Sequence, residues 1–159
     1  MELIALPLTA DAFAPYGEVL EAPAEAGRTF FESSLGNLRP GARPSLKIVT
    51  KLPVRGLPLE ANVLERHEFS SQSFVPLDVG RMLIVVAPHA PEGGPDVKRA
   101  LAFLASSRQG VTYRPNTWHH GATVLDKPAR FAVFMWCDGT AGDEQFVSVP
   151  PFSIRERDS

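Results

Sequence analysis

The chain has 159 residues, of which 44% are hydrophobic and 21% are charged, a composition typical of a folded globular protein. We expect a single domain over residues 1–159, because this length is common for one hydrophobic core and short for two. The formal net charge of -2 offers no basic surface to phosphates or anionic headgroups, so we expect neither nucleic acid nor a membrane as a partner.

The first residues predict a short helix and no targeting signal. Thr9 is a suitable N-cap for the segment TADAFAPYG, which ends at a proline and a glycine. The N-terminus lacks a basic leader followed by a long apolar run, so a cytoplasmic location is expected. Cys137 is the single cysteine, which excludes an internal disulfide, and we expect it to be an ordinary apolar strand residue.

Short apolar and β-branched runs recur along the chain, and we expect each of them to form a strand. They are FFESS at 30, SLKIVTKL at 45, NVLERHEF at 62, SFVPL at 73, RMLIVVAP at 81, GVTYRP at 110, TWHHGATVL at 117, ARFAVFMWC at 129 and EQFVSV at 144. Turn sequences rich in glycine and proline separate these runs. Many short strands without alternating helices predict a mainly β fold, an antiparallel sandwich or barrel.

The segment PDVKRALAFLASSRQG is ambiguous between two kinds of element. Val97, Leu101 and Leu104 fall on one helical face, which predicts a second short helix. The same segment equally suits a strand from Ala100 to Leu104, and the sequence leaves both alternatives open.

Polar side chains with catalytic potential gather in two of the expected strands. The first strand carries Glu65, Arg66, His67 and Gln72, and the second carries Tyr113, Arg114, Trp118, His119 and His120. Residues two apart on a strand share a face, so Glu65 and His67 point together and Arg66 points away. The two adjacent histidines diverge for the same reason, so only one of them lines a given cavity unless a bulge intervenes.

The spacing of these residues resembles that of cupin barrels, which hold a metal with an HxH motif, a later glutamate and a PxGxxH motif. The matching positions are Glu65, His67, Gln72 and His120, and we expect this set to point into the barrel. Gln72 is neutral where cupins have an anionic glutamate, which weakens the hold on a divalent cation. The resemblance implies either a weak metal site or a pocket for acid and base chemistry without metal, and we expect no required cofactor.

A structural role is the alternative for every one of these polar residues. A lone histidine on a strand is usually a satisfied core or surface group, and we expect this of His89 and, at least as readily as a functional role, of His119. Four convergent polar groups inside a small barrel are a different case, because burying them without a function costs several kcal/mol.

Over nearly the whole chain the sequence resembles the ureidoglycolate lyase family, also called ureidoglycolate hydrolase. The segments that carry the resemblance are LPLTADAFAPYGEVLE, LERHEFSSQSFVPL, RMLIVVAP and QGVTYRPNTWHHGATVL. It implies a cupin-like antiparallel β-barrel of the jelly-roll type with one or two short helices, usually a homodimer. It also implies cleavage of ureidoglycolate to glyoxylate and urea in allantoin and purine catabolism. The family often has His at the position of Arg114 and another segment in place of Met135 to Glu144, which leaves the substrate open.

The chemistry of ureidoglycolate assigns a role to each candidate. The substrate is a carbinolamine, so its cleavage needs a base for the hydroxyl proton, an acid for the departing nitrogen and a cation for the carboxylate. We expect His120 to be the base, with Glu65 and His67 beside it. Arginine suits the carboxylate, although strand alternation disfavours Arg66 and favours Arg114 only if no bulge intervenes near Pro115. The other substrate contacts are expected from Gln72, Tyr113, Trp118 and His119.

Two other classes of protein remain open on the sequence. One is a metal-dependent cupin oxygenase or isomerase that acts on another small organic acid. The other is a domain that binds or senses a small acid without catalysis. The absence of an appended DNA-binding segment argues against a sensor.

Overall fold

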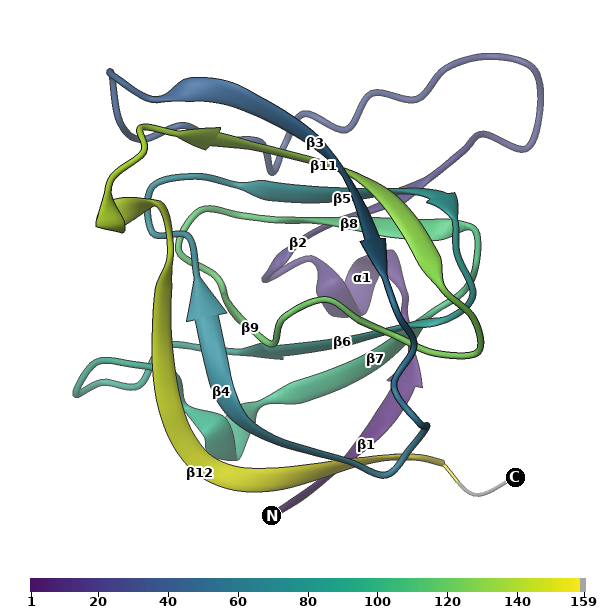
Figure 1. Cartoon of the computed structure of the whole chain (residues 1–159), viewed down its shortest axis with the longest axis vertical. Helices are drawn as coiled ribbons and strands as arrows, with labels where there is room; N and C mark the ends of the chain where they lie inside the picture. The colour runs from purple at the N-terminus through teal and green to yellow at the C-terminus, as the bar shows by residue number, and fades with distance from the viewer. Residues whose placement is uncertain (158–159) are drawn as a thin grey trace.

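The computed structural model describes residues 1–157, and over this range the chain is mainly β with one short α-helix (Figure 1). The strands are β1 (Glu2–Pro7), β2 (Gly17–Glu21), β3 (Arg43–Lys51), β4 (Leu59–Arg66), β5 (Gln72–Asp78), β6 (Met82–Ala87), β7 (Leu101–Ala105), β8 (Gln109–Tyr113), β9 (Trp118–His119), β10 (Thr123–Val124), β11 (Ala129–Cys137) and β12 (Gln145–Glu156). The helix is α1 (Ala10–Phe13), and two 3-10 turns are η1 (Val97–Arg99) and η2 (Ala141–Asp143).

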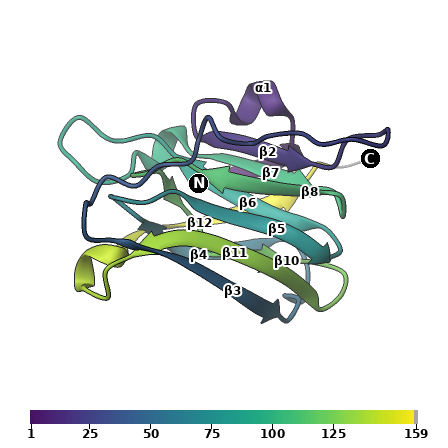
Figure 2. The same ribbon diagram turned by 90° about the horizontal axis from the view of Figure 1, so that it is seen from above.

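The strands form two sheets that pack against each other (Figures 1 and 2). The larger sheet has the order β10-β6-β7-β1-β12-β4-β9, and β9 also pairs with β6, so six of its strands close into a barrel. The smaller sheet has the order β2-β8-β5-β11-β3. The predicted β-barrel is confirmed. It departs from an antiparallel barrel at β1, which runs parallel to both of its neighbours, β7 and β12.

Strand β6 is buried on both faces and separates two hydrophobic cores. Ile84 packs between the sheets together with Phe74 and Phe131 of the smaller sheet. Val85 packs on the other face, inside the barrel, with Leu64. A strand buried on both faces requires a continuous apolar run, which is what the sequence RMLIVVAP supplies.

The helix predictions have different outcomes. The N-terminal helix is confirmed, and the side chain of Thr9 accepts a hydrogen bond from the main-chain N–H of Ala12. The second helix is wrong, because only η1 is helical and the following residues form β7, the alternative that the sequence also allowed. Strand β7 pairs with β6 on one edge and β1 on the other, and this pairing outweighs the helical spacing of its apolar residues.

One strand was predicted wrongly and two were missed. Residues 30–34, the FFESS run, lie in the long connection between β2 and β3 and form no strand. Strands β1 and β2 were not predicted, although β1 occupies a central position in the larger sheet. Both are short, and they form strands because they pair with neighbouring strands in the two sheets.

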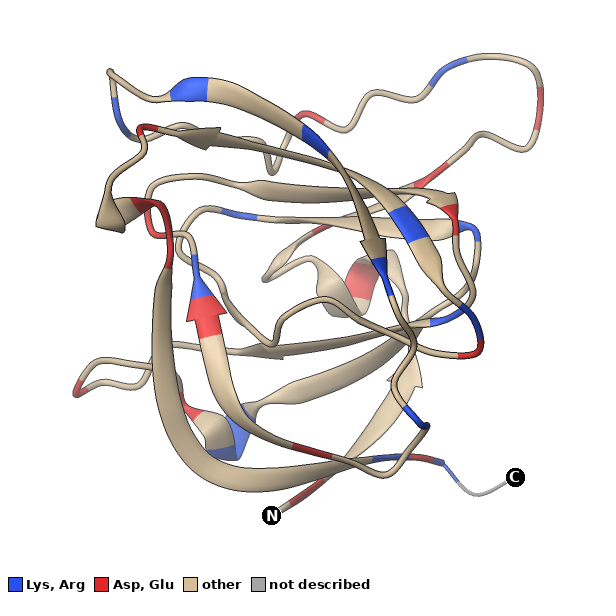
Figure 3. Ribbon diagram, in the orientation of Figure 1, with Lys and Arg blue, Asp and Glu red and all other residues tan. Residues whose placement is uncertain are grey.

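Charged side chains of both signs are interspersed along the strands and loops (Figure 3). Several pair with residues far away in the sequence, such as Lys127 with Asp78 and Arg155 with Glu2. Within residues 1–157, no helix is long and apolar enough to cross a membrane.

Candidate active site

Three polar side chains meet where β4 and β9 face the smaller sheet. Glu65, near the end of β4, is the direct cross-strand partner of His119 in β9, and His67 follows β4 immediately. One carboxylate oxygen of Glu65 and one ring nitrogen of each histidine all lie within 4.8 Å of one another. We call Glu65, His67 and His119 the polar cluster.

The structure places His119, and not His120, against Glu65. Nε2 of His119 is 3.4 Å from Oε1 of Glu65. His120 lies just beyond β9, where its main-chain N–H donates to the carbonyl of Val85 and its Nδ1 is 3.2 Å from the hydroxyl of Thr123. The register of β9 against β4 decides which histidine contacts Glu65, and the sequence does not encode it locally. The role of His120 as the base stays a prediction.

Hydrogen bonds fix which ring nitrogen of each histidine faces the cluster. Nδ1 of His67 is 2.8 Å from the main-chain oxygen of Asp143, and Nδ1 of His119 is 2.9 Å from the main-chain oxygen of Thr117. A carbonyl oxygen only accepts hydrogen bonds, so both Nδ1 atoms carry a proton. Each Nε2 atom is therefore directed at the cluster, and neither has a hydrogen-bond partner in the described part of the chain.

The two histidines of the polar cluster have different surroundings. Burial lowers the pKa of His67 below its ordinary value of 6.5, which keeps its ring neutral at neutral pH. His119 lies between two oxygen groups, with the Thr117 carbonyl at Nδ1 and the Glu65 carboxylate 3.4 Å from Nε2. Burial would raise the pKa of Glu65, but the close approach of His119 and the neighbouring histidines outweighs it and lowers this pKa.

Two side chains of the smaller sheet flank the cluster. Tyr113 of β8 stacks on the ring of His119, with centroids 4.0 Å apart and planes 13° from parallel. Gln72 of β5 is the cross-strand partner of Tyr113 and shares its face of the sheet. The carboxamide of Gln72 is buried, and its Oε1 atom has no hydrogen-bond partner within residues 1–157.

Unpartnered buried atoms therefore gather in this region. They are Nε2 of His67, Nε2 of His119 and Oε1 of Gln72. Leaving one buried polar atom without a partner costs about 1–3 kcal/mol, so a group of them indicates a place for a ligand.

Neither candidate arginine belongs to the polar cluster. Arg66 points away from it, as predicted, donating to the side chain of Asn116 at 2.6 Å and lying over the ring of Trp118. Arg114 donates to the main-chain oxygen of Ala14. Trp118 itself is buried in the core inside the barrel. The geometry gives no support to these three residues as substrate contacts.

Two residues that the sequence marked as structural have structural surroundings. Nδ1 of His89 accepts from the indole N–H of Trp118 at 3.2 Å, and its Nε2 donates to the main-chain oxygen of Asn116 at 2.8 Å. Both ring nitrogens are thus used, as predicted. Cys137 ends strand β11, and burial raises the pKa of its thiol, which keeps it in the unreactive form.

The sequence did not predict the loop that contacts His67. Asp143 lies in the turn-rich segment CDGTAGD, which reads only as a chain reversal. Its role depends on a main-chain oxygen, which every residue has, so residue type gives no signal for it.

Comparisons with known proteins agree on one enzyme family. The pattern of the family described as ureidoglycolate lyase matches residues 1–154. A ureidoglycolate lyase of Chelativorans sp. (strain BNC1) is 38% identical over 162 residues, which cover 96% of each chain. Another, of Burkholderia mallei (strain NCTC 10229), is 38% identical over 136 residues, which cover 80% of this chain and 78% of the relative.

A solved structure is similar in fold. It is a dTDP-sugar isomerase from Desulfovibrio desulfuricans G20, with a TM-score of 0.50, 18% sequence identity and coverage of 84% of this chain and 82% of that chain. At this identity the similarity concerns the fold alone.

Proposed function

The chain belongs to the ureidoglycolate lyase family, and we propose that its polar cluster is where ureidoglycolate is cleaved to glyoxylate and urea. One observation carries the assignment of the site. A neutral histidine, His67, lies beside His119, whose Nε2 is 3.4 Å from the carboxylate of Glu65, and Nε2 of His67 has no hydrogen-bond partner within residues 1–157. Collapse of a carbinolamine needs a base and an acid at the same carbon, and this pair supplies both.

In the proposed reaction His67 is the base and His119 is the acid. Nε2 of His67 takes the proton of the substrate hydroxyl, and the electrons left on that oxygen form the aldehyde carbonyl of glyoxylate. The carbon–nitrogen bond breaks, and the departing ureido nitrogen takes the proton from Nε2 of His119, which releases urea. His67 gains one proton and His119 loses one, so transfer of a proton through solvent restores the starting state.

The neighbouring side chains support the acid and the substrate. Glu65 stabilises the imidazolium form of His119, and that positive charge also favours the substrate carboxylate, the task that the sequence gave to an arginine. The carboxamide of Gln72 matches a ureido group, since Oε1 accepts from its N–H and Nε2 donates to its carbonyl. Tyr113 holds the ring of His119 by stacking. His120 remains a candidate for the base, because it lies close enough to interact electrostatically with Glu65.

The residues of the cluster also fit a divalent metal ion. Two imidazoles and one carboxylate with open positions form a set that suits ions such as Fe(II). The hydrogen bonds at both Nδ1 atoms direct the Nε2 lone pairs inward, as metal-binding histidines require. A bound metal would supply Lewis-acid polarisation of a substrate oxygen. A metal-dependent enzyme at the same residues is therefore the second candidate, whereas our proposal requires no metal.

Glyoxylate release from ureidoglycolate tests both candidates. We expect the purified protein to release glyoxylate at the same rate before and after dialysis against a chelator. A loss that one divalent ion restores would establish the metal-dependent alternative. No release under either condition would overturn the proposed function.

We further propose that the chain works as a homodimer, formed through the outer face of the smaller sheet. Edge strand β3 presents Leu46 and Ile48, which are 70% and 64% exposed, and their cross-strand partners are Phe134 and Ala132 of β11. Apolar side chains gathered on one exposed face are typical of a protein contact. Sedimentation of Ile48→Glu should then show a monomer where the unmodified chain is a dimer. The cytoplasmic location stays a prediction from the sequence.

A further inference from the structure

The loop that contacts His67 is organised by one acidic residue, Asp143. The carboxylate of Asp143 accepts hydrogen bonds from the main-chain N–H groups of Asp138, at 2.9 Å, and Gly139, at 2.8 Å. The main-chain oxygen of the same residue accepts the Nδ1 proton of His67. The residue that ties the loop together is therefore also the residue that decides where the proton of His67 sits.

Arg39 ties this loop from the opposite side. Its guanidinium pairs with the carboxylates of Asp138 and Asp143, and its side chain is only 14% exposed, so water screens these pairs weakly. The same guanidinium lies over the ring of Phe69, 5.3 Å from the centroid, and Phe69 belongs to the turn that begins at His67. Arg39 thus contacts both the loop and the turn that the loop must meet.

The connection that carries Arg39 is itself fixed to this turn. The main-chain N–H of Leu38 donates to the carbonyl of Phe69 at 2.8 Å, and the N–H of Ser71 donates to the carbonyl of Gly36 at 2.9 Å. Arg39 therefore starts from a backbone that is held in place, and its guanidinium transmits that position to the loop.

We propose that Arg39 and Asp143 are positioning residues that keep the proton of His67 on Nδ1 and its Nε2 lone pair free for the substrate. Without the guanidinium, the carboxylates of Asp138 and Asp143 repel each other, and the loop loses the tie that holds its carbonyl against Nδ1. A neutral imidazole released from this carbonyl also populates the form with the proton on Nε2, which has no lone pair there and cannot act as the base. The inference rests on the proposed function, because it gives His67 the role of base.

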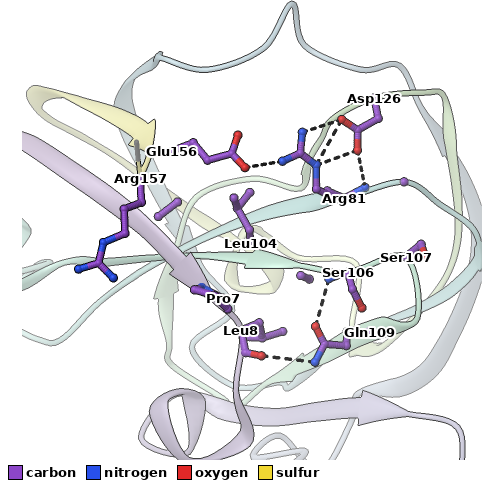
Figure 4. Close-up of a pocket in the computed structure, with 13 residues that line it drawn as sticks. Pro7, Leu8, Arg81, Leu104, Ser106, Ser107, Gln109, Asp126, Glu156 and Arg157 are labelled. Carbon is purple, nitrogen blue, oxygen red and sulfur yellow. Dashed lines mark hydrogen bonds and ion pairs between the residues drawn. The ribbon is translucent and has the colours of Figure 1, made fainter. Parts of the chain in front are cut away.

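Kinetics of Arg39 variants test the inference against a matched control. Arg81 is the control, because it also pairs with two carboxylates, those of Asp126 and Glu156 (Figure 4). It precedes β6, whereas His119 pairs with Val86 near the opposite end of that strand. We expect Arg39→Ala to lower kcat by about tenfold to a hundredfold, the usual effect of removing a partner that orients a reactive histidine. KM should change by less than about threefold, because neither residue contacts the substrate. Arg39→Lys should recover part of the loss, and Arg81→Ala should leave kcat and KM unchanged.

Nitrogen NMR of the His67 ring gives a readout that does not depend on the reaction. We expect the proton on Nδ1 in the unmodified chain and in Arg81→Ala, and a mixture of both neutral forms in Arg39→Ala. A loss of kcat without any change in the His67 ring would overturn the inference, as would an unchanged kcat in folded Arg39→Ala.

The failure of this inference is distinguishable from the failure of the proposed function. If the unmodified chain releases no glyoxylate, the proposed function fails, and the ring spectra still decide whether Arg39 sets the proton position of His67. If Arg39→Ala does not fold, Arg39→Lys and Asp143→Asn provide the same comparison. Unchanged ring spectra in both of these variants would then overturn the inference.

Discussion

The polar groups at the two ends of strand β6 differ in whether they have partners. At one end Val86 is the cross-strand partner of His119, whose Nε2 is buried and has no hydrogen-bond partner among residues 1–157. At the other end, next to the first residue of β6, Arg81 pairs with Asp126 and Glu156 beside a cavity of about 710 Å³ (Figure 4). This cavity therefore lies at the end of β6 where the charged side chains already form ion pairs. Our proposal of the reaction site therefore rests on buried polar atoms without partners and not on the size of an opening.

The residues around the Arg81 cavity offer little chemistry. Hydrogen bonding to Asp126 raises the pKa of Arg81, which therefore keeps its proton under all relevant conditions. Gln109 is also occupied, since its side chain donates to the main-chain oxygen of Leu8 and accepts from the main-chain N–H of Ser106. A guanidinium that keeps its proton and a carboxamide whose oxygen and N–H are both engaged offer neither a base nor an acid for proton transfer.

The largest effect is expected at the histidine end, from His119→Gln. Glutamine keeps a polar side chain of similar length but cannot deliver a proton, so kcat should fall by about a hundredfold to ten-thousandfold. The neighbouring substitution His120→Gln should cost less than about tenfold, because His120 lacks the direct contact with Glu65. Steady-state glyoxylate release, with melting temperatures to confirm folding, checks both. A larger loss at His120 would restore the assignment made from the sequence.

A smaller effect is expected from Glu65→Gln. The substitution keeps the shape of the side chain and removes the charge that stabilises the imidazolium of His119. A hydrogen bond to a charged group contributes about 1.5–3 kcal/mol, which corresponds to a loss of about tenfold to a hundredfold in kcat. The same kinetic assay measures it. An unchanged rate would show that His119 does not need the carboxylate, and would remove the acid from the proposed reaction.

The sequence predicted the strands of this fold better than the contacts between them. The run RMLIVVAP predicts a strand because local composition suffices for an element that is buried on both faces. Strand β7 was ambiguous because its apolar residues fit two periods, and only its pairing with β1 and β6 decides between them. Local sequence signals therefore predict individual strands, whereas the neighbours of each strand depend on long-range pairing in the sheet.

The same limit explains the outcome at the site. The sequence predicted that Glu65 and His67 lie together, and the structure brings them together, because alternation and spacing are local properties. Choosing between His119 and His120 required the register of β9 against β4, which is a long-range property.

A modest effect of pH on stability is expected from the histidine end. Burial lowers the pKa of His67 in the folded chain below 6.5, so the unfolded chain takes up a proton first as the pH falls. The stabilisation is therefore complete above pH 6.5 and is lost progressively below it. Thermal melting of chelator-treated protein between pH 7.5 and pH 5.5 measures the loss, and His67→Gln should reduce it. A melting temperature that does not respond to pH in this range would contradict the neutral state of His67.

The smallest effect is expected at the other end of β6, from Arg81→Ala. The side chains of Arg81, Asp126 and Glu156 are 41%, 42% and 50% exposed, so water screens both ion pairs. Exposed pairs contribute about 0.2–1 kcal/mol each, so the melting temperature should fall by a few degrees, and by less at high salt. The kcat should not change, since no reacting atom lies near this residue. The pairs of Arg39 are of the same chemical kind, but they act on a loop that holds His67. Equal losses of kcat in Arg81→Ala and Arg39→Ala would therefore mean that ion pairing acts through general stability, and that the two ends of β6 do not differ in function.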